Sequence, residues 1–115
     1  MEERRLSDTI PDALIAKMRR FGSDISAARR ARNWTQGDLA ERLNVSRKVI
    51  SAMEQGSPSV SFGAYAASAW IMGLENGLLG AFDPEHDPAF QKKARLDQPK
   101  RVRPGRGADL GSLDF

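Results

Sequence analysis

The sequence predicts an all-α fold. Three observations favour this class: no segment alternates apolar and polar residues as a half-buried strand does, apolar residues recur at helical spacing between residues 11 and 82, and helix-capping residues precede these stretches. No internal repeat is visible. With 115 residues, 40% of them apolar, the chain suits one domain with a small core and is too short for a deep catalytic cleft.

Two helices are expected before the first turn. The first opens at Pro11 and ends at Gly22, because proline suits the first turn of a helix and glycine its end. Its apolar stripe consists of Leu14, Ile15, Met18 and Phe21. The second opens at Ser23 or Asp24 and runs to about Arg32.

A third and a fourth helix follow, joined by a tight turn. Thr35 is a strong N-cap for the third helix, and Asp38 completes a shortened capping box. Asn44 can make the turn because Asn tolerates a positive φ, and Ser46 caps the fourth helix, which ends at Gly56. The fourth helix places Val49, Ile50 and Met53 on one face and Arg47, Lys48, Ser51, Ala52 and Gln55 on the other.

A fifth helix over residues 62–72 and a short sixth over 74–82 complete the expected domain. The uncharged stretch from Ser59 to Leu74 is too short to span a bilayer and is interpreted as a core helix. Four aromatic residues lie at core spacing: Trp34, Phe62, Tyr65 and Trp70. A short helix around Ala89 to Leu96 is expected before a tail rich in Pro, Gly and charge, which should be disordered alone.

Charge is divided into three segments. Residues 17–48 hold nine basic and three acidic side chains, residues 49–91 hold five acidic and no basic ones, and residues 92–106 hold seven basic ones against Asp97. Two basic segments suit a polyanion such as nucleic acid. A solvated basic face without a ligand is the alternative.

Most enzyme classes are excluded by the residues that the chain lacks. Without Cys there is no disulfide framework, thiolate metal site or cysteine nucleophile. His86 has no second imidazole for a metal site, and the acidic turn around it is a weak ligand set. We therefore expect neither enzymatic activity nor a cofactor or bound metal. The start, MEERRLSDTI, lacks the pattern of a signal peptide, which favours a cytoplasmic protein.

The two capped helices around Asn44 make a helix-turn-helix. The segment RRARNWTQGDLAERLNVSRKVISAMEQG resembles the DNA-binding domain of the XRE/Cro group of bacterial regulators, which includes phage repressors. The resemblance implies a lambda-repressor-like domain of five to six helices. Asn44 and Gly37 depart from the family's usual residues without removing a contact.

The N-terminal part of the fourth helix is the predicted reading surface. A major groove about 12 Å wide accepts one α-helix, whose first outward residues then face the base edges. Arg47 can donate two hydrogen bonds to guanine, Lys48 can reach the same acceptors, and Ala52 can touch a thymine methyl. The predicted base contacts are Ser46, Arg47, Lys48, Ser51 and Ala52. The predicted phosphate contacts are Thr35, Gln36, Arg42 and Gln55.

One acidic residue of the fourth helix is predicted to be structural. Glu54 shares a helix side with Ile50 and should be partly buried, so it needs a partner. In the family, an acid here commonly pairs with a basic residue seven positions before the Gln, which in this chain is Arg29.

The segment MEQGSPSVSFGAYAASAWIMGLENGLLGAFDPEHDP is similar to the HipB-type antitoxin branch of this family, whose members dimerise, repress their own operon and bind a HipA-like serine/threonine kinase toxin. This resemblance implies a homodimer on operator DNA near the bacterial nucleoid. The expected dimer interface consists of Leu74, Leu78, Leu79 and Phe82, with Leu14 and Met18 of the first helix as the alternative. A free-standing phage-type regulator, or an RNA-binding or protein-binding adaptor, remains an alternative function.

The tail is expected to bind a partner. Its basic part consists of Lys100, Arg101, Arg103 and Arg106, which would attract phosphate or an acidic surface. Its apolar end consists of Leu110, Leu113 and Phe115, which would dock on a partner such as the kinase.

The sequence therefore predicts three parts: an N-terminal extension over 1–22, the helix-turn-helix domain over 23–82, and the acidic turn, short helix and flexible basic tail over 83–115.

Overall fold

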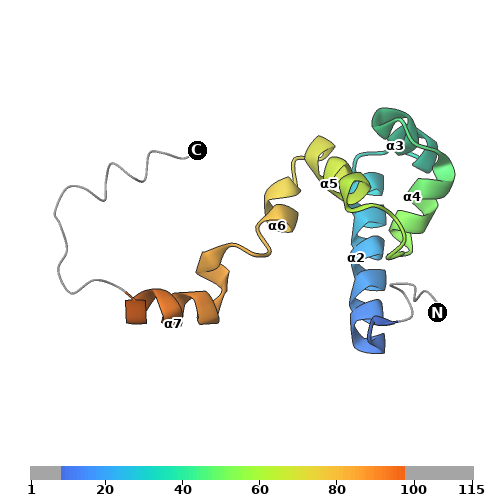
Figure 1. The fold of residues 1–115 in the computed structure, drawn as a ribbon. Helices are drawn as coiled ribbons and strands as arrows, with labels where there is room; N and C mark the ends of the chain where they lie inside the picture. The colour runs from blue at the N-terminus through green and yellow to red at the C-terminus, as the bar shows by residue number, and fades with distance from the viewer. Residues whose placement is uncertain (1–8, 98–115) are drawn as a thin grey trace, which may run out of the picture. The chain divides into compact units, whose positions relative to one another are not determined.

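The computed structural model describes residues 9–97, and within this range every regular element is helical, so the all-α prediction is confirmed. The elements in Figure 1 are α2 (Asp12–Ala31), α3 (Gln36–Leu43), α4 (Arg47–Glu54), α5 (Phe62–Ile71), α6 (Glu75–Leu79), the 3-10 turn η1 (Pro84–His86) and α7 (Pro88–Asp97). The chain divides into two compact units after Gly80.

The prediction of two helices before residue 33 is wrong, because α2 continues through Gly22 as one helix of 20 residues. Gly22 is needed for close packing and does not end the helix. A Cβ added there would lie 2.5 Å from the backbone N of Gly56 and 2.7 Å from the carbonyl O of Glu54. The expected limit between residues 22 and 23 therefore falls inside α2, and the first turns of α2 belong to the packed unit.

The capping residues form the turns that the sequence predicts. Asp38 N donates to Thr35 Oγ1 over 3.0 Å, and Thr35 N donates to Asp38 Oδ2 over 2.8 Å, which completes the capping box of α3. Asn44 has a φ of 59° between α3 and α4, and Ser46 Oγ accepts from Val49 N at the start of α4. These local bonds fix the angle at which α4 leaves α3.

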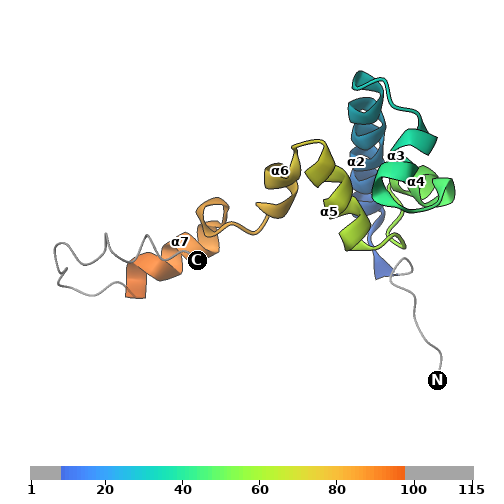
Figure 2. The ribbon, with the colours of Figure 1, turned by 90° about the horizontal axis from the view of Figure 1, so that it is seen from above.

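The core of the first unit lies where α2, α3, α4 and α5 meet. Leu39, Ile50 and Met53 are fully buried, and burial of such side chains stabilises the fold by about 1.5–3 kcal/mol each. Figures 1 and 2 show α4 beside α2 and α3 beside α4, in agreement with the contacts between these helices. The Tyr65 hydroxyl donates to the Ser57 carbonyl over 2.7 Å and ties α5 to the loop after α4.

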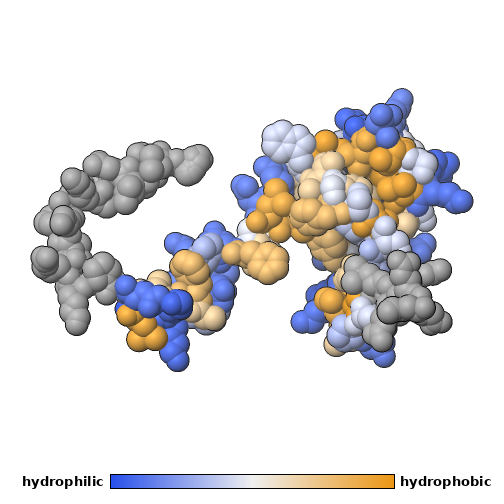
Figure 3. All heavy atoms as spheres, in the orientation of Figure 1, coloured by the Kyte–Doolittle hydropathy of each residue, from blue (hydrophilic) through white to orange (hydrophobic). Residues whose placement is uncertain are grey.

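The prediction that all four aromatic residues lie at core positions is half wrong. Tyr65 is buried and Trp34 packs against the core, whereas Phe62 is 60% and Trp70 67% exposed. The reason is the register of α5, which turns Tyr65 and Ser68 inward. Because α5 has no charged residue, its sequence did not show which face is outside. Figure 3 shows apolar side chains gathered on the visible face of this unit.

The second unit consists of η1 and α7 within the described range. The short helix expected around Ala89 to Leu96 is present as α7. Gln91 Nε2 donates to the Pro84 carbonyl over 2.9 Å, which joins α7 to η1. Apart from half-buried Gln91, every residue from 81 to 97 is exposed. The predicted tail contacts lie outside the described residues: Lys100, Arg101, Arg103, Arg106, Leu110, Leu113 and Phe115.

Candidate nucleic-acid interface

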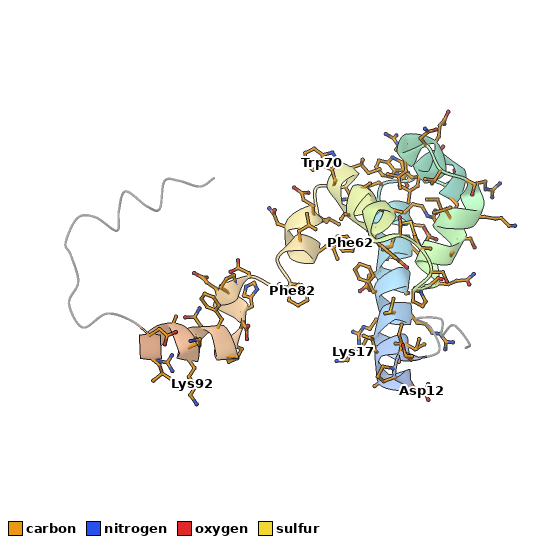
Figure 4. All side chains as sticks on the ribbon, in the orientation of Figure 1. Asp12, Lys17, Phe62, Trp70, Phe82 and Lys92 are labelled. Carbon is orange, nitrogen blue, oxygen red and sulfur yellow. The ribbon has the colours of Figure 1, made fainter. Side chains whose placement is uncertain are left out.

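The outer face of α4 carries the residues predicted to read bases. Ser46, Arg47 and Lys48 are exposed, and Ser51 and Ala52 are half-buried on the same helix. On the opposite side, Ile50 and Met53 are fully buried. The core therefore fixes the rotation of α4 about its own axis and leaves one polar face to the solvent. Figure 4 shows the side chains of α4 on its outer side.

Arg47 and Lys48 have no hydrogen-bond or ion-pair partner among residues 9–97. An Arg guanidinium presents five donors and a Lys ammonium three. Both groups are consequently available to acceptors on a ligand. Their position in the first turn of α4 is the one from which a helix in the major groove reaches base edges.

A buried ion pair holds α4 against α2. Arg29 Nε lies 2.6 Å from Glu54 Oε2, and Arg29 Nη2 lies 3.1 Å from Glu54 Oε1. The two side chains are 10% and 7% exposed. Arg29 Nη1 also donates to the Trp34 carbonyl over 2.7 Å, so the same guanidinium fixes the link between α2 and α3. Arg29 and Glu54, which the family resemblance predicts to form a pair, are therefore in contact.

The first residue of α3 joins this network, because Gln36 Nε2 donates to Glu54 Oε1 over 3.0 Å. Burial raises the pKa of Glu54, but the hydrogen bonds from Arg29 and Gln36 outweigh burial and hold the pKa below its ordinary value. The hydrogen bond to Glu54 raises the pKa of Arg29. Both groups are therefore ionised at neutral pH, and α2, α3 and α4 are connected through one carboxylate.

The predicted phosphate contacts surround α4, and each side chain already has a partner within the protein. Thr35 belongs to the capping box, and Gln36 binds Glu54. The Arg42 guanidinium lies 4.2 Å from the centre of the Trp34 ring, a cation–π contact. Gln55 Nε2 lies 3.5 Å from Ser51 Oγ. These bonds orient the side chains, and exposed Arg42 and Gln55 keep further donors for a ligand.

The sequence reasoning missed a loop beside α4. An open cavity of about 370 Å³ separates the α4 residues Lys48 and Ala52 from the loop before α5. Three alternating serines line it: Ser57, Ser59 and Ser61. Ser61 caps α5, whose first N–H groups lack partners within the helix, as at any helix start. Hydroxyl and amide donors thus flank α4, and the spacing S-P-S-V-S between two helices was the sequence signal.

Within the described range, no group of His, Asp and Glu side chains could hold a metal ion, and no helix is long and apolar enough to cross a membrane.

Residues 25–63 match the family model described as helix-turn-helix. This segment runs from the second half of α2 to the start of α5 and contains α3 and α4. No curated protein and no solved structure matches the chain.

Proposed function

We propose that this chain, a DNA-binding regulator of transcription that carries a helix-turn-helix domain, is a repressor that binds a palindromic operator as a two-fold dimer. One observation carries the proposal. The first turn of α4 presents Arg47 and Lys48 without partners among residues 9–97, on a helix that the core and the Arg29–Glu54 pair hold in one orientation. A preorganised helix with free donors suits base readout in a major groove.

The base contacts follow from the face of α4. Arg47 donates two hydrogen bonds to guanine, Lys48 reaches a neighbouring acceptor, and Ser46 and Ser51 bond base edges or a phosphate. Half-buried Ala52 faces a thymine methyl. Around them Thr35, Gln36, Arg42 and Gln55 contact the phosphate backbone, which sets the register of the protein without reading sequence.

The dimer interface is proposed at the end of the first unit. Leu74 is 51% and Leu79 56% exposed, and Leu78 is half-buried against the core. Phe82, which follows in the second unit, is 96% exposed. Large exposed apolar side chains of this kind mark interaction sites. Leu14, 44% exposed, and half-buried Met18 on α2 are the alternative interface.

Selection from random DNA duplexes with the full chain tests the proposal. The enriched sequences should contain inverted half-sites whose centres are about 34 Å or a multiple of it apart. If binding is equal on all duplexes and depends on salt alone, α4 is not a reading helix. The variant Glu54→Gln, which leaves the outer face of α4 unchanged but removes a buried charge, separates loss of orientation from loss of base contacts.

The finer proposal is an antitoxin of the HipB type, which binds a HipA-like kinase and represses its own operon. It is supported by the sequence resemblance of residues 53–88 and by the apolar end of the tail. Co-expression with a kinase-like product of an adjacent gene should give a stable complex. Deletion of residues 108–115 should weaken that complex and leave operator affinity nearly unchanged. An equally tight complex after deletion contradicts docking through Leu110, Leu113 and Phe115.

The alternative is a free-standing regulator without a toxin partner. The exposed face of α4 supports it equally, because DNA reading needs no second protein. A chain that binds its operator tightly, and whose neighbouring genes encode no kinase-like protein, favours this alternative.

A further inference from the structure

Another open cavity lies between the first turns of α2 and the loop that follows α4. Its volume is about 520 Å³. Small-molecule sites in proteins have volumes of about 300–1,000 Å³. Ile15 and Arg19 form the α2 side of the cavity, and the segment from Glu54 to Pro58 forms the other side. We call this space the α2–loop cavity.

The α2 side of the cavity belongs to turns that precede the matched domain, since the match to the family model begins at residue 25. In Figure 1 these first turns of α2 extend past the end of α4. Ile15 and Arg19 are four residues apart and therefore lie on one side of the helix. A Cβ added at Gly56 would lie 2.8 Å from the Arg19 backbone N, so α2 touches the loop beside the cavity. The cavity thus depends on a part of this chain that the helix-turn-helix family model does not include.

The loop side of the cavity is held in place by hydrogen bonds. Gly56 N donates to the Met53 carbonyl over 2.9 Å. Ser57 N donates to the Ala52 carbonyl over 3.0 Å, and the Ser57 carbonyl accepts from the Tyr65 hydroxyl over 2.7 Å. Walls that are formed before a ligand arrives lower the entropy cost of binding it. The loop side therefore offers a ligand a fixed surface.

The cavity carries a positive charge that no other charge in its lining compensates. Arg19 is exposed and has no hydrogen-bond or ion-pair partner among residues 9–97. Glu54 adds no free negative charge, because Arg29 Nε lies 2.6 Å from Glu54 Oε2. Gln36 also donates to this carboxylate, over 3.0 Å. The charge of the lining therefore favours an anion.

Neutral donors and apolar side chains complete the lining. Ser57 Oγ accepts from Ser59 N over 3.1 Å and keeps its own hydrogen for a ligand. Exposed Gln55 has an amide group with a second N–H beyond the one directed at Ser51. Ile15 and Pro58 are half-buried and supply apolar carbon atoms. The lining thus combines a cation, two neutral donors and an apolar surface.

We propose that the α2–loop cavity binds a small organic monocarboxylate with an apolar body. The planar guanidinium of Arg19 can donate two parallel hydrogen bonds to a carboxylate. A single guanidinium balances one negative charge, whereas a phosphate monoester carries about −1.5 to −2 at neutral pH and would be left partly unpaired. The Ser57 hydroxyl donates to a remaining lone pair of the carboxylate, and the apolar body lies against Ile15 and Pro58.

The consequence for DNA binding rests on the proposed function. Gln55 lines the cavity and is also one of the predicted phosphate contacts at the end of α4. A carboxylate beside Gln55 brings a negative charge towards the DNA phosphates and occupies a donor that a phosphate would use. The bound monocarboxylate should therefore weaken operator binding, as an inducer does. Operator DNA should weaken binding of the monocarboxylate by the same factor, because coupling between two binding sites is reciprocal.

Titration of the full chain with sodium hexanoate, followed by calorimetry and by NMR of the ¹⁵N-labelled protein, tests the site. Saturable shifts are expected at the amides of Ile15, Gly56 and Ser57, with a dissociation constant of about 1 mM or lower. Acetate lacks the apolar body and hexanamide lacks the charge, so each should bind at least about tenfold more weakly. No saturable shift at these amides, or equal affinity for hexanoate and hexanamide, overturns the inference.

Two neighbouring arginines provide a matched pair of variants. Arg19→Gln should raise the dissociation constant for hexanoate at least about tenfold. It should leave the melting temperature nearly unchanged, because Arg19 is exposed and has no partner among residues 9–97. Arg20→Gln is the control, since Arg20 is also exposed on α2 but does not line the cavity. Equal affinity of the two variants for hexanoate overturns the inference.

The contribution of the apolar wall is measured with a third variant. Each methylene of a ligand that enters an apolar site strengthens binding about three- to fourfold. Ile15→Ala should therefore reduce the preference of the chain for hexanoate over acetate, while the affinity for acetate stays nearly the same. An unchanged preference overturns the placement of the apolar body against Ile15.

Operator titrations with and without hexanoate test the regulatory consequence, with sodium chloride at equal concentration as the control for salt. Hexanoate should weaken operator binding about fivefold or more in the wild type and in Arg20→Gln, but not in Arg19→Gln. A chain that binds hexanoate at the cavity without any change in operator affinity overturns this consequence and leaves the ligand site standing. A chain that selects no sequence from random DNA removes the proposed function, and the hexanoate titration still decides whether the site exists.

Discussion

Gly22 of α2 and Gly56 after α4 approach each other so closely that neither position has room for a Cβ. A Cβ at Gly22 would lie 2.5 Å from Gly56 N, and one at Gly56 would lie 2.0 Å from the Met18 carbonyl O. Gly56 also has a φ of 74°, which side chains rarely adopt. The two glycines therefore set the distance between α2 and the C-terminal end of α4.

Replacement of either glycine should destabilise the first unit. Gly22→Ala forces the backbones apart, and we expect a loss of about 1–3 kcal/mol in the free energy of unfolding. Unfolding by a chemical denaturant measures this loss in the free energy of unfolding. The control is Gly77→Ala on α6, where nothing lies within 4 Å of an added Cβ and little loss is expected. Equal effects at positions 22 and 77 would contradict the close approach.

Removal of the Glu54 charge should be costly because Arg29 would remain buried without its partner. For Glu54→Ala we expect a loss of about 3 kcal/mol or more in the free energy of unfolding. The exposed pair between Lys93 and Asp97 on α7 is the control, since such pairs contribute at most about 1 kcal/mol. Asp97→Ala should therefore leave the melting of the first unit nearly unchanged.

Acid should weaken the fold through the same carboxylate. The pKa of Glu54 in the folded chain lies below its ordinary value of 4.5, so the ion pair contributes fully above that pH. As the pH falls through the lower folded-state pKa, the contribution is lost. The free energy of unfolding should thus decrease below about pH 4.5, and the decrease should be smaller in Glu54→Gln. If the free energy of unfolding depends on pH identically in the wild type and in Glu54→Gln, Glu54 is not the group responsible.

Base and phosphate contacts should respond differently to mutation. Arg47→Ala and Lys48→Ala should each weaken operator binding by about 1–3 kcal/mol and relax the sequence preference. Gln36→Ala should weaken binding to all duplexes alike. Arg30, exposed on α2 and bonded to Ser26, provides a matched Arg→Ala control that should change neither quantity. Titration of operator and random duplexes at one salt concentration measures all four variants.

The sequence predicted what depends on neighbouring residues. Thr35 with Asp38, Asn44 and Ser46 define the turn by short-range bonds, so their roles were readable from spacing alone. The break at Gly22 was wrong because the role of that glycine depends on Gly56, which is distant in sequence. The sequence also left the orientation of α5 open, because a helix without charged residues does not mark its outer face.

The length of α2 determines which segment must be moved if the helix-turn-helix of this protein is to be transferred into another regulator. The match to the family model begins at residue 25, in the middle of α2, whereas the turns of α2 that hold Met18 and Gly22 support the end of α4. A transferred segment that begins at residue 25 would expose the backbone at Gly56 to water. It would also lack the turns of α2 that support the C-terminal end of α4. A segment that starts at Pro11 and ends at Gly80 keeps the whole of α2 and therefore the support for α4.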